Sequence, residues 1–321
     1  MAIKIGSFNM FKFSQHRSDN EIKKDLNKIA DIIKGEEFDI VALQEVFSER
    51  ALEDIRARLG LYWDCVWKAP DAKSAKAAEG YGYLWNNRRF RPATGLKKEE
   101  RKIAKEDRTG YARKVFDPTI QNRWHGQLLR DPLYARFESV HGWYEIRLIN
   151  THIVYSAKSK EDESNETECS QSDALVRQQE LERLLDIYRT VEDKVYRSSR
   201  PCYTVMLGDY NLNLKSSEAK GPYLDPVSEK QERNGRIQKK IITVQDELTT
   251  LKGKSKTEPD KPIQGFANNY DHFSYDANRF NRIKMQYGRV NTVEKYCNND
   301  FEQHRKEISD HVPIYLSITL N

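Results

Sequence analysis

Two kinds of hydrophobic pattern alternate along this chain of 321 residues. Short runs rich in β-branched and aromatic residues predict strands, and a near-continuous apolar run is typical of a strand buried on both faces. Apolar residues that recur every three or four positions predict amphipathic helices. The expected strands are residues 3–9, 39–44, 82–85, 134–139, 144–150, 203–207 and 313–319, the last preceded by a loop from residue 305, and the expected helices are 21–34, 52–59 and 173–188. This alternation predicts stacked sheets with helices on their outer faces.

Two polar, charge-rich stretches interrupt the alternation, at about residues 86–126 and 215–264. Neither has the composition of a linker throughout, and we find no internal repeat, so we expect one domain, 1–321, with two polar insertions. The first insertion contains 12 basic and 5 acidic residues. Such a cluster attracts polyanions, because each neutralised phosphate releases condensed counterions. A solvated surface face and a contact for a protein partner remain alternatives.

Composition narrows the class of protein. The mean hydropathy of -0.84 and the lack of a long apolar run argue against a membrane protein. The first residues predict a strand, without a basic and then apolar leader ahead of it. The four cysteines, Cys65, Cys169, Cys202 and Cys297, form no C-x-x-C pair and no zinc spacing. We therefore expect reduced thiols in a cytoplasmic protein, with a secreted protein whose signal was removed as the alternative.

Polar residues stand at the ends of apolar runs in six places. They are Asn9, Gln44-Glu45, Asn150-Thr151-His152, Asp209-Tyr210-Asn211, Tyr270-Asp271-His272 and Ser309-Asp310-His311. Any one of them has an ordinary explanation, because Asn and Asp are turn formers. Six together indicate more than turn chemistry. Since strand ends can converge on one edge of a layered sheet, we expect these side chains to meet in one cleft.

These residue types suit metal-assisted hydrolysis. Oxygen ligands such as Glu45, Asp310 and the Asn9 amide suit Mg²⁺ or Mn²⁺, and histidines suit proton transfer near neutral pH. Asp209 and Asn211 are two positions apart, so on an extended segment their side chains share a face. The chain contains no G-x-S-x-G elbow, Walker loop or H-E-x-x-H helix. Activated water is therefore the expected nucleophile.

The motifs SFN, QE, NTH, GDYN, YDH and SDH, in this order, resemble the endonuclease/exonuclease/phosphatase superfamily, and most closely its deoxyribonuclease I-like branch. The resemblance runs from Ile3 to Ile318, broken by the two insertions. It implies a four-layered α/β sandwich, in which two mixed β-sheets pack face to face with helices outside.

The resemblance also implies roles for single residues. Asn9, Glu45 and Asp310 match the positions that hold the divalent metal. His152 and His311 match the two catalytic histidines. Which of them acts as acid and which as base stays open.

Five further residues match supporting positions of the superfamily. Asp209 and Asn211 match the pair that contacts the scissile phosphate or a second metal. Asp271 matches the carboxylate that orients His311, and Glu79, in the segment EGYGYLW, matches the carboxylate that orients His152. Arg130 lies in a stretch similar to the branch's Arg-x-Pro sequence, which makes it a candidate phosphate-binding residue.

The resemblance thus implies a Mg²⁺- or Mn²⁺-dependent phosphodiesterase that hydrolyses the nucleic-acid backbone, with a DNA endonuclease favoured. An RNA nuclease has the same site and remains open, as does an inositol-phosphate or sphingomyelin phosphoesterase, because the NTH motif occurs there too. Glu79 and Arg130 favour the nucleases, and the polar insertions argue against a lipid substrate. A non-catalytic binding module is disfavoured, because all six motifs are present. We expect nucleic acid as partner, DNA before RNA, and no membrane.

Overall fold

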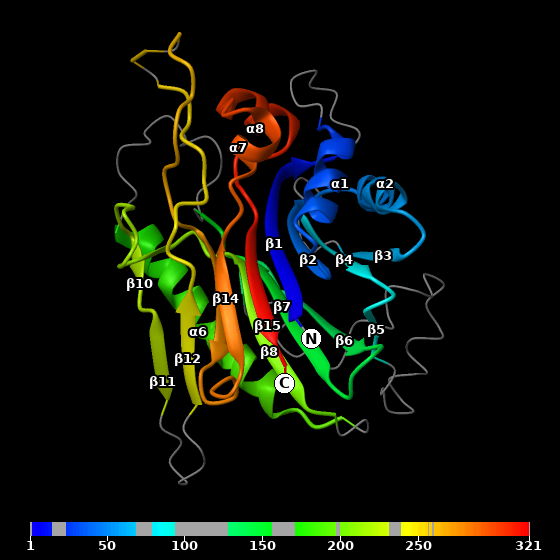
Figure 1. The fold of residues 1–321 in the computed structure, drawn as a ribbon. Coiled ribbons are helices and arrows are strands. Elements are labelled where there is room, and N and C mark those ends of the chain that lie inside the picture. The colour runs from blue at the N-terminus through cyan, green and yellow to red at the C-terminus, as the bar shows by residue number, and fades with distance from the viewer. Residues whose placement is uncertain are drawn as a thin grey trace.

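The computed structural model describes residues 2–14, 24–68, 79–93, 128–155, 171–196, 200–230, 239–255, 257–258 and 260–320. Two mixed β-sheets lie face to face, and helices cover their outer faces (Figure 1). The apolar inner faces of both sheets form one shared core, which includes Ile5 and Tyr83 from the first sheet and Leu148 and Val205 from the second. These four layers confirm the expected α/β sandwich.

The first sheet has six strands, in the order β14-β15-β1-β2-β4-β3. β1 and β2 are parallel, and every other neighbouring pair is antiparallel. In chain order the strands are β1 (Ala2–Phe13), β2 (Ile40–Val46), β3 (Trp63–Lys68), β4 (Gly80–Asn86), β14 (Lys284–Arg289) and β15 (Ile314–Thr319).

The second sheet has seven strands, in the order β11-β12-β13-β8-β7-β6-β5. Only β7 and β8 run parallel among its neighbouring pairs. The strands are β5 (Phe90–Pro92), β6 (Leu133–Ser139), β7 (Glu145–His152), β8 (Cys202–Asp209), β11 (Val227–Lys230), β12 (Lys239–Val244) and β13 (Asp271–Asp276). A separate short pair, β9 (Asn213–Leu214) and β10 (Tyr223–Leu224), follows β8 in the chain.

Helices α1 (Leu26–Gly35) and α2 (Glu49–Leu59) cover the outer face of the first sheet. Ile29 of α1 and Leu52 of α2 pack in one apolar cluster with Leu43 of β2. The longer helix α6 (Gln171–Asp193) covers the second sheet, where Leu184 packs in a cluster with Met206 of β8. Two short helices, α7 (Thr292–Cys297) and α8 (Phe301–Glu307), precede β15.

Two helix starts are determined by capping side chains. The Asp25 carboxylate accepts hydrogen bonds from the backbone N–H groups of Asn27 and Lys28, so α1 begins at Leu26. The predicted helix 21–34 starts at residues 21–23, which lie outside the described part of the chain. The Asp300 carboxylate caps α8 in the same way. The predicted loop from residue 305 was therefore wrong at its start, because Arg305 lies in the last turn of α8.

The two predicted insertions fare differently. Of residues 86–126, positions 94–127 lie outside the described part of the chain, and β5 occupies part of the remainder. The stretch 215–264 supplies β11 and β12, and β12 pairs with β13 inside the second sheet. This stretch is thus partly sheet. Although the surrounding sequence is polar, Ile241 of β12 packs into the apolar cluster under α6 and helps to hold the strand in the sheet.

No helix in the described ranges is long and apolar enough to cross a membrane. Cys65, Cys202 and Cys297 are free thiols, and Cys169 lies outside the described residues.

Candidate active site

The register of the second sheet brings three predicted residues side by side. His152 ends β7, Asp209 ends β8, and Asp271 begins β13. In the strand pairing, Asp209 lies opposite His152 on one side and opposite Asp271 on the other. Residues directly opposite one another in a sheet project from the same face, so the register alone groups these three side chains.

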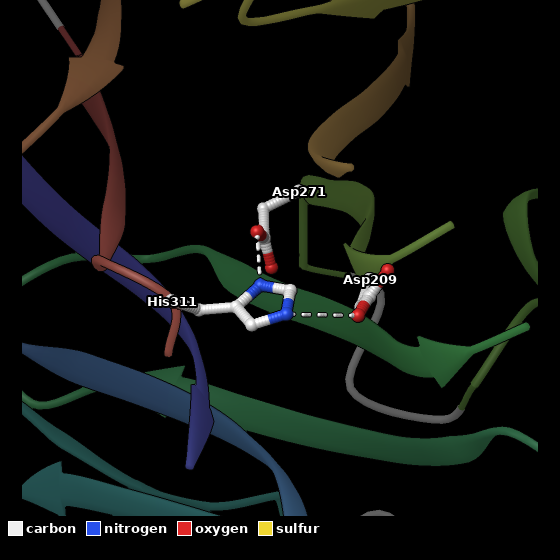
Figure 2. Close-up of side chains that lie close together, drawn as sticks. All are labelled: Asp209, Asp271 and His311. Atoms are coloured by element: carbon white, nitrogen blue, oxygen red, sulfur yellow. Dashed lines mark hydrogen bonds and ion pairs between the residues drawn. The ribbon is translucent and has the colours of Figure 1, made fainter. Parts of the chain in front are cut away.

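His311 joins this group from the other sheet, where it lies shortly before β15. Its Nδ1 is 2.8 Å from Asp271 Oδ2, and its Nε2 is 3.6 Å from Asp209 Oδ2 (Figure 2). Burial disfavours the charged imidazolium, but the Asp271 carboxylate, with further help from Asp209, raises the pKa of His311 to about 10. His311 is therefore protonated on both nitrogens at neutral pH.

The carboxylate of Asp209 is at the centre of the site. Its Oδ2 accepts a hydrogen bond from Asn9 Nδ2 at 3.0 Å, and its Oδ1 accepts one from the Asn211 backbone N–H at 2.8 Å. Burial raises the pKa of Asp209 to about 7, against the opposing effect of the His311 charge. Asp209 can therefore hold or release a proton near neutral pH.

Asn211 reaches the site in a different way from the one predicted. The segment after Asp209 is not extended: Asn211 has a φ of 49°, and its own N–H turns back to Asp209. Its side-chain amide donates to the Ile153 carbonyl at 2.8 Å, next to His152. A turn closed by the aspartate side chain, and not the two-residue strand period, places Asp209 and Asn211 together.

His152 has a cationic neighbour instead of the expected carboxylate. Arg130 Nη1 lies 2.6 Å from His152 Nδ1, and a guanidinium can only donate, so Nδ1 accepts and the ring proton is on Nε2. Burial, followed by the charges of Arg130 and His311, holds the pKa of His152 well below its usual range. The His152 backbone N–H also donates to Tyr81 Oη at 3.1 Å. His152 is thus a neutral imidazole, whose Nε2 is 3.7 Å from Asp209 Oδ2.

Glu79 acts on His152 through Arg130. The Glu79 carboxylate forms an ion pair with Arg130 Nη2, and its Oε2 is 3.6 Å from His152 Nδ1, which is too long for a hydrogen bond. Glu79 was predicted to orient His152 directly. The Arg130 guanidinium takes that place, because it pairs with the Glu79 carboxylate and bonds the His152 imidazole, and both contacts hold Arg130 beside His152.

Glu45 and Asp310 form a second acidic group beside the first. Strand β2 is bulged at Glu45, which has a φ of 56°, so this side chain leaves the regular alternation of the strand. Burial, then the charges of Glu79 and Asp310, raise the pKa of Glu45. Asp310 Oδ1 is buried and makes no hydrogen bond to any described residue. Two carboxylates that repel one another, one with an unsatisfied oxygen, fit a hard divalent cation.

Asn9 presents its nitrogen, and not its oxygen, to these carboxylates. Its Nδ2 donates to Glu45 Oε1 at 3.2 Å and to Asp209 Oδ2 at 3.0 Å, while its Oδ1 accepts from the Phe11 backbone N–H at 3.0 Å. The predicted Asn9 oxygen ligand would need the amide to rotate and break all three bonds. In this structure Asn9 positions the carboxylates of both acidic groups.

Asp209, Asp271 and His311 each offer one possible metal-ligand atom, and these atoms lie within 4.8 Å of one another, close enough to hold a metal ion. His311 Nδ1 is engaged by Asp271 Oδ2 at 2.8 Å, so only Nε2 and the Asp209 carboxylate face the site from this group. The group can hold a proton between these residues, and the Glu45–Asp310 pair adds two further carboxylates that suit a hard cation.

Two buried charges on α6 were missed by the sequence analysis. Arg177 Nη1 donates to the Asn211 carbonyl at 2.7 Å, and Glu180 Oε1 accepts from the Leu129 N–H at 3.1 Å. Being three positions apart, both lie on the same side of the helix. They hold the turn of Asn211 and the segment just before Arg130. The signal was present in the sequence, since Arg177 and Glu180 interrupt an otherwise apolar stripe that continues with Leu181 and Leu184.

Comparison with known proteins supports the fold. No family model and no curated protein sequence matches the chain. Among solved structures, an endonuclease/exonuclease/phosphatase from Bacteroides vulgatus matches over 100% of both chains with a TM-score of 0.53 and 13% identity. A family protein from Bacteroides thetaiotaomicron covers 100% of this chain and 98% of its own, with a TM-score of 0.52 and 12% identity.

D. rerio TDP2, solved in complex with a single-strand DNA product, matches over 99% of each chain with a TM-score of 0.51 and 12% identity. Identities this low bear on the fold alone. At that level they agree with the two face-to-face mixed sheets and their outer helices. The chain has the fold of the endonuclease/exonuclease/phosphatase superfamily, the deoxyribonuclease I-like sandwich.

Proposed function

We propose that this protein is a divalent-metal-dependent phosphodiesterase that hydrolyses the backbone of nucleic acids, with DNA as the favoured substrate. One observation carries the proposal: the Asp209 Oδ2 atom lies 3.7 Å from His152 Nε2 and 3.6 Å from His311 Nε2, beside the Glu45–Asp310 pair. The site thereby combines a proton acceptor, a neutral donor, a cationic donor and a metal site.

Glu45 and Asp310 would hold Mg²⁺ or Mn²⁺, with Asn9 fixing the direction of the Glu45 carboxylate. When bound, the cation would polarise a phosphoryl oxygen and stabilise charge on the leaving oxygen. Asp310 offers the buried Oδ1 that has no hydrogen bond to the described residues. The other Asp310 oxygen lies 3.3 Å from Arg305 Nη2.

The remaining residues would handle the proton and the phosphate. Asp209, with a pKa of about 7, is placed to accept the proton of an attacking water. Distances of 3.6 and 3.7 Å leave the His311 and His152 Nε2–H groups without a hydrogen bond to Asp209. Each can therefore donate to a phosphoryl oxygen, His311 as a cation and His152 as a neutral group. Arg130 contacts both His152 and Glu79, so it would bind a phosphoryl oxygen that lies next to His152.

Three observations favour a nucleic-acid substrate. The fold neighbour TDP2 was solved with a single-strand DNA product. Arg130, the residue that favours the nucleases in the sequence, lies against His152. The basic stretch 86–126 supplies positive charge for a polyanion, or for a protein partner that carries one.

The test is digestion of supercoiled plasmid, linear duplex, single-strand DNA and RNA with Mg²⁺, with Mn²⁺ and with EDTA. We expect metal-dependent cleavage of DNA that is lost in Asp310→Ala. Sphingomyelin and a bis-phosphorylated inositol serve as the opposing substrates. If only these two substrates are hydrolysed, the protein is a phosphoesterase but not a nuclease. Cleavage that does not depend on metal would contradict the proposed mechanism.

A further inference from the structure

Lys24 places a buried ammonium group at the proposed metal site. It lies just before α1, and its Nζ is buried without a hydrogen bond to any residue of the described ranges. The Nζ lies 5.3 Å from the centre of the Phe11 ring, on the strand segment that follows Asn9. Sequence analysis gave no role to this lysine.

The charges that keep this ammonium buried are those of the proposed metal ligands. Burial disfavours the charged form and lowers the pKa of Lys24 to about 8, while the Asp310 and Glu45 carboxylates oppose that effect. The geometry agrees with this, because Lys24 Nζ lies beside the same Phe11 ring as Arg305, the residue that pairs with Asp310.

Arg305 is the second cation of this group, and it is held more firmly. Its Nη2 is 3.3 Å from Asp310 Oδ2, and its guanidinium carbon is 5.2 Å from the centre of the same Phe11 ring. Lys24 and Arg305 thus place two positive charges near Glu45 and Asp310, and Lys12 Nζ lies 5.4 Å from the centre of the same Phe11 ring. A divalent cation on the same carboxylates would leave a large excess of positive charge in a buried site, so a side-chain cation has to give way. Lys24 is the one whose buried Nζ has no hydrogen bond to a described residue, and it has a flexible stem.

We propose that Lys24 is an internal counter-cation that competes with the divalent metal for Glu45 and Asp310, and that it thereby sets the metal affinity of the site. The inference rests on the proposed function, because it takes these carboxylates as the metal ligands. In the metal-free protein Lys24, together with Arg305, offsets the charge of the two carboxylates. Binding of the metal then displaces the ammonium group toward solvent.

The test is direct Mn²⁺ binding, measured by titration calorimetry and by loss of the free Mn²⁺ electron paramagnetic resonance signal. We compare the wild type with Lys24→Met, which keeps the stem and removes the charge, and with Lys24→Gln as a second neutral variant. Lys28→Met is the matched control. Lys28 lies outside the site, and its Nζ is 2.6 Å from Glu307 Oε2. Glu45→Gln removes a ligand. Thermal unfolding shows that each variant folds.

We expect both neutral Lys24 variants to bind Mn²⁺ about tenfold more tightly than the wild type, or better, because a positive charge near the cation is gone. Lys28→Met should stay within about twofold, because its ion pair with Glu307 is partly exposed and lies apart from the two carboxylates, and Glu45→Gln should lose binding. If the Lys24 variants bind Mn²⁺ as the wild type does or more weakly, and Glu45→Gln still loses binding, then Lys24 is not a counter-cation. The metal site itself would remain supported. Equal binding by wild type and Glu45→Gln overturns the metal site, and this inference with it.

Discussion

His152 and His311 are chemically identical residues that the structure places in opposite surroundings. His152 faces Arg130, and burial together with that charge lowers its pKa. His311 faces Asp271, whose carboxylate overcomes the effect of burial and raises its pKa. One site therefore holds a neutral and a charged imidazole at the same pH, which is how environment divides acid–base roles between like residues.

Replacing Asp271 by Asn tests the origin of the His311 charge. Without the carboxylate, the pKa of His311 should fall from about 10 toward 6.5, as followed by the ring proton shifts in an NMR titration. Because the pKa of His311 is raised in the folded protein, the pairing of His311 with Asp271 stabilises the fold fully below pH 6.5. This contribution is lost as the pH rises through about 10.

The stability difference between wild type and Asp271→Asn, measured by urea unfolding, should therefore shrink as pH rises from 6.5 to about 10. A difference that stays constant across this range would show that Asp271 has only a structural role.

Single replacements of His152 and Asp310 by Ala should each lower turnover by at least about 10²-fold, the scale of a lost acid, base or metal-held charge. Steady-state cleavage of the best substrate measures this, alongside circular dichroism to check folding. His141→Ala is the matched control, since His141 is exposed and lies in the turn between β6 and β7. Turnover near the wild-type value in either site variant would contradict the assigned role.

At the scale of elements, the parallel pair β7 and β8 approaches very closely just where it carries His152 and Asp209. Gly208 has a φ of 141°, and a Cβ at this position would lie 1.8 Å from the Thr151 carbonyl oxygen. Backbone fills that space, so no side-chain movement can relieve the contact. The glycine before Asp209 is thus required for the strand register that groups the site.

Gly208→Ala should therefore separate the ends of β7 and β8. We expect a loss of unfolding free energy on the order of 3 kcal/mol, with loss of cleavage even where the variant stays folded. Gly253→Ala is the control, because a Cβ there meets nothing within 4 Å. Equal thermal stability of the two variants would show that the strands are further apart than described.

At the scale of the whole molecule, two buried amides join the sheets beneath the site. Gln44 Nε2 of β2 donates to Asn150 Oδ1 of β7 at 2.7 Å. The Asn150 amide nitrogen donates to the Leu43 carbonyl at 3.0 Å and to the Gly82 carbonyl at 3.3 Å, both in the first sheet. Unlike the apolar core, these directional bonds determine how one sheet is placed over the other.

A double-mutant cycle on Gln44 and Asn150 measures this connection. Asn150→Leu removes one of the two acceptors of the Gln44 amide nitrogen, which keeps its bond to Ser7 Oγ, and removes a buried donor from the Leu43 and Gly82 carbonyls, so it should cost on the order of 3 kcal/mol in urea unfolding. Gln44→Met should also destabilise the fold. The double variant should lose less unfolding free energy than the two single variants lose together, because each single replacement already breaks the bond between Gln44 and Asn150. Full additivity would mean that the bond between the sheets contributes nothing.

Sequence and structure agree best where the information is local. The period of apolar residues predicted the strands around Leu43, Leu148 and Val205 and the helices of the outer layers, because burial on one face or on both is written directly in the hydrophobic pattern. The ends were less predictable. The Asp25 cap placed the start of α1 at Leu26, and irregular pairing carried β1 and β2 beyond Asn9 and Glu45, where Phe11, Lys12 and Glu45 adopt positive φ values that the hydrophobic pattern does not encode.

By itself, the sequence determined the layered α/β class, the order of the polar motifs and the residue types available for chemistry, all of which depend on neighbours in the chain. Only the tertiary structure decided that Arg130 and not Glu79 lies within hydrogen-bond distance of His152 Nδ1, that Asn9 donates to two carboxylates, and that Lys24 Nζ is buried beside Phe11. The physical reason is that charge, proton and hydrogen-bond partners are set by distance and desolvation. These arise where segments such as residues 9 and 209 meet, far apart in the chain and adjacent in the fold.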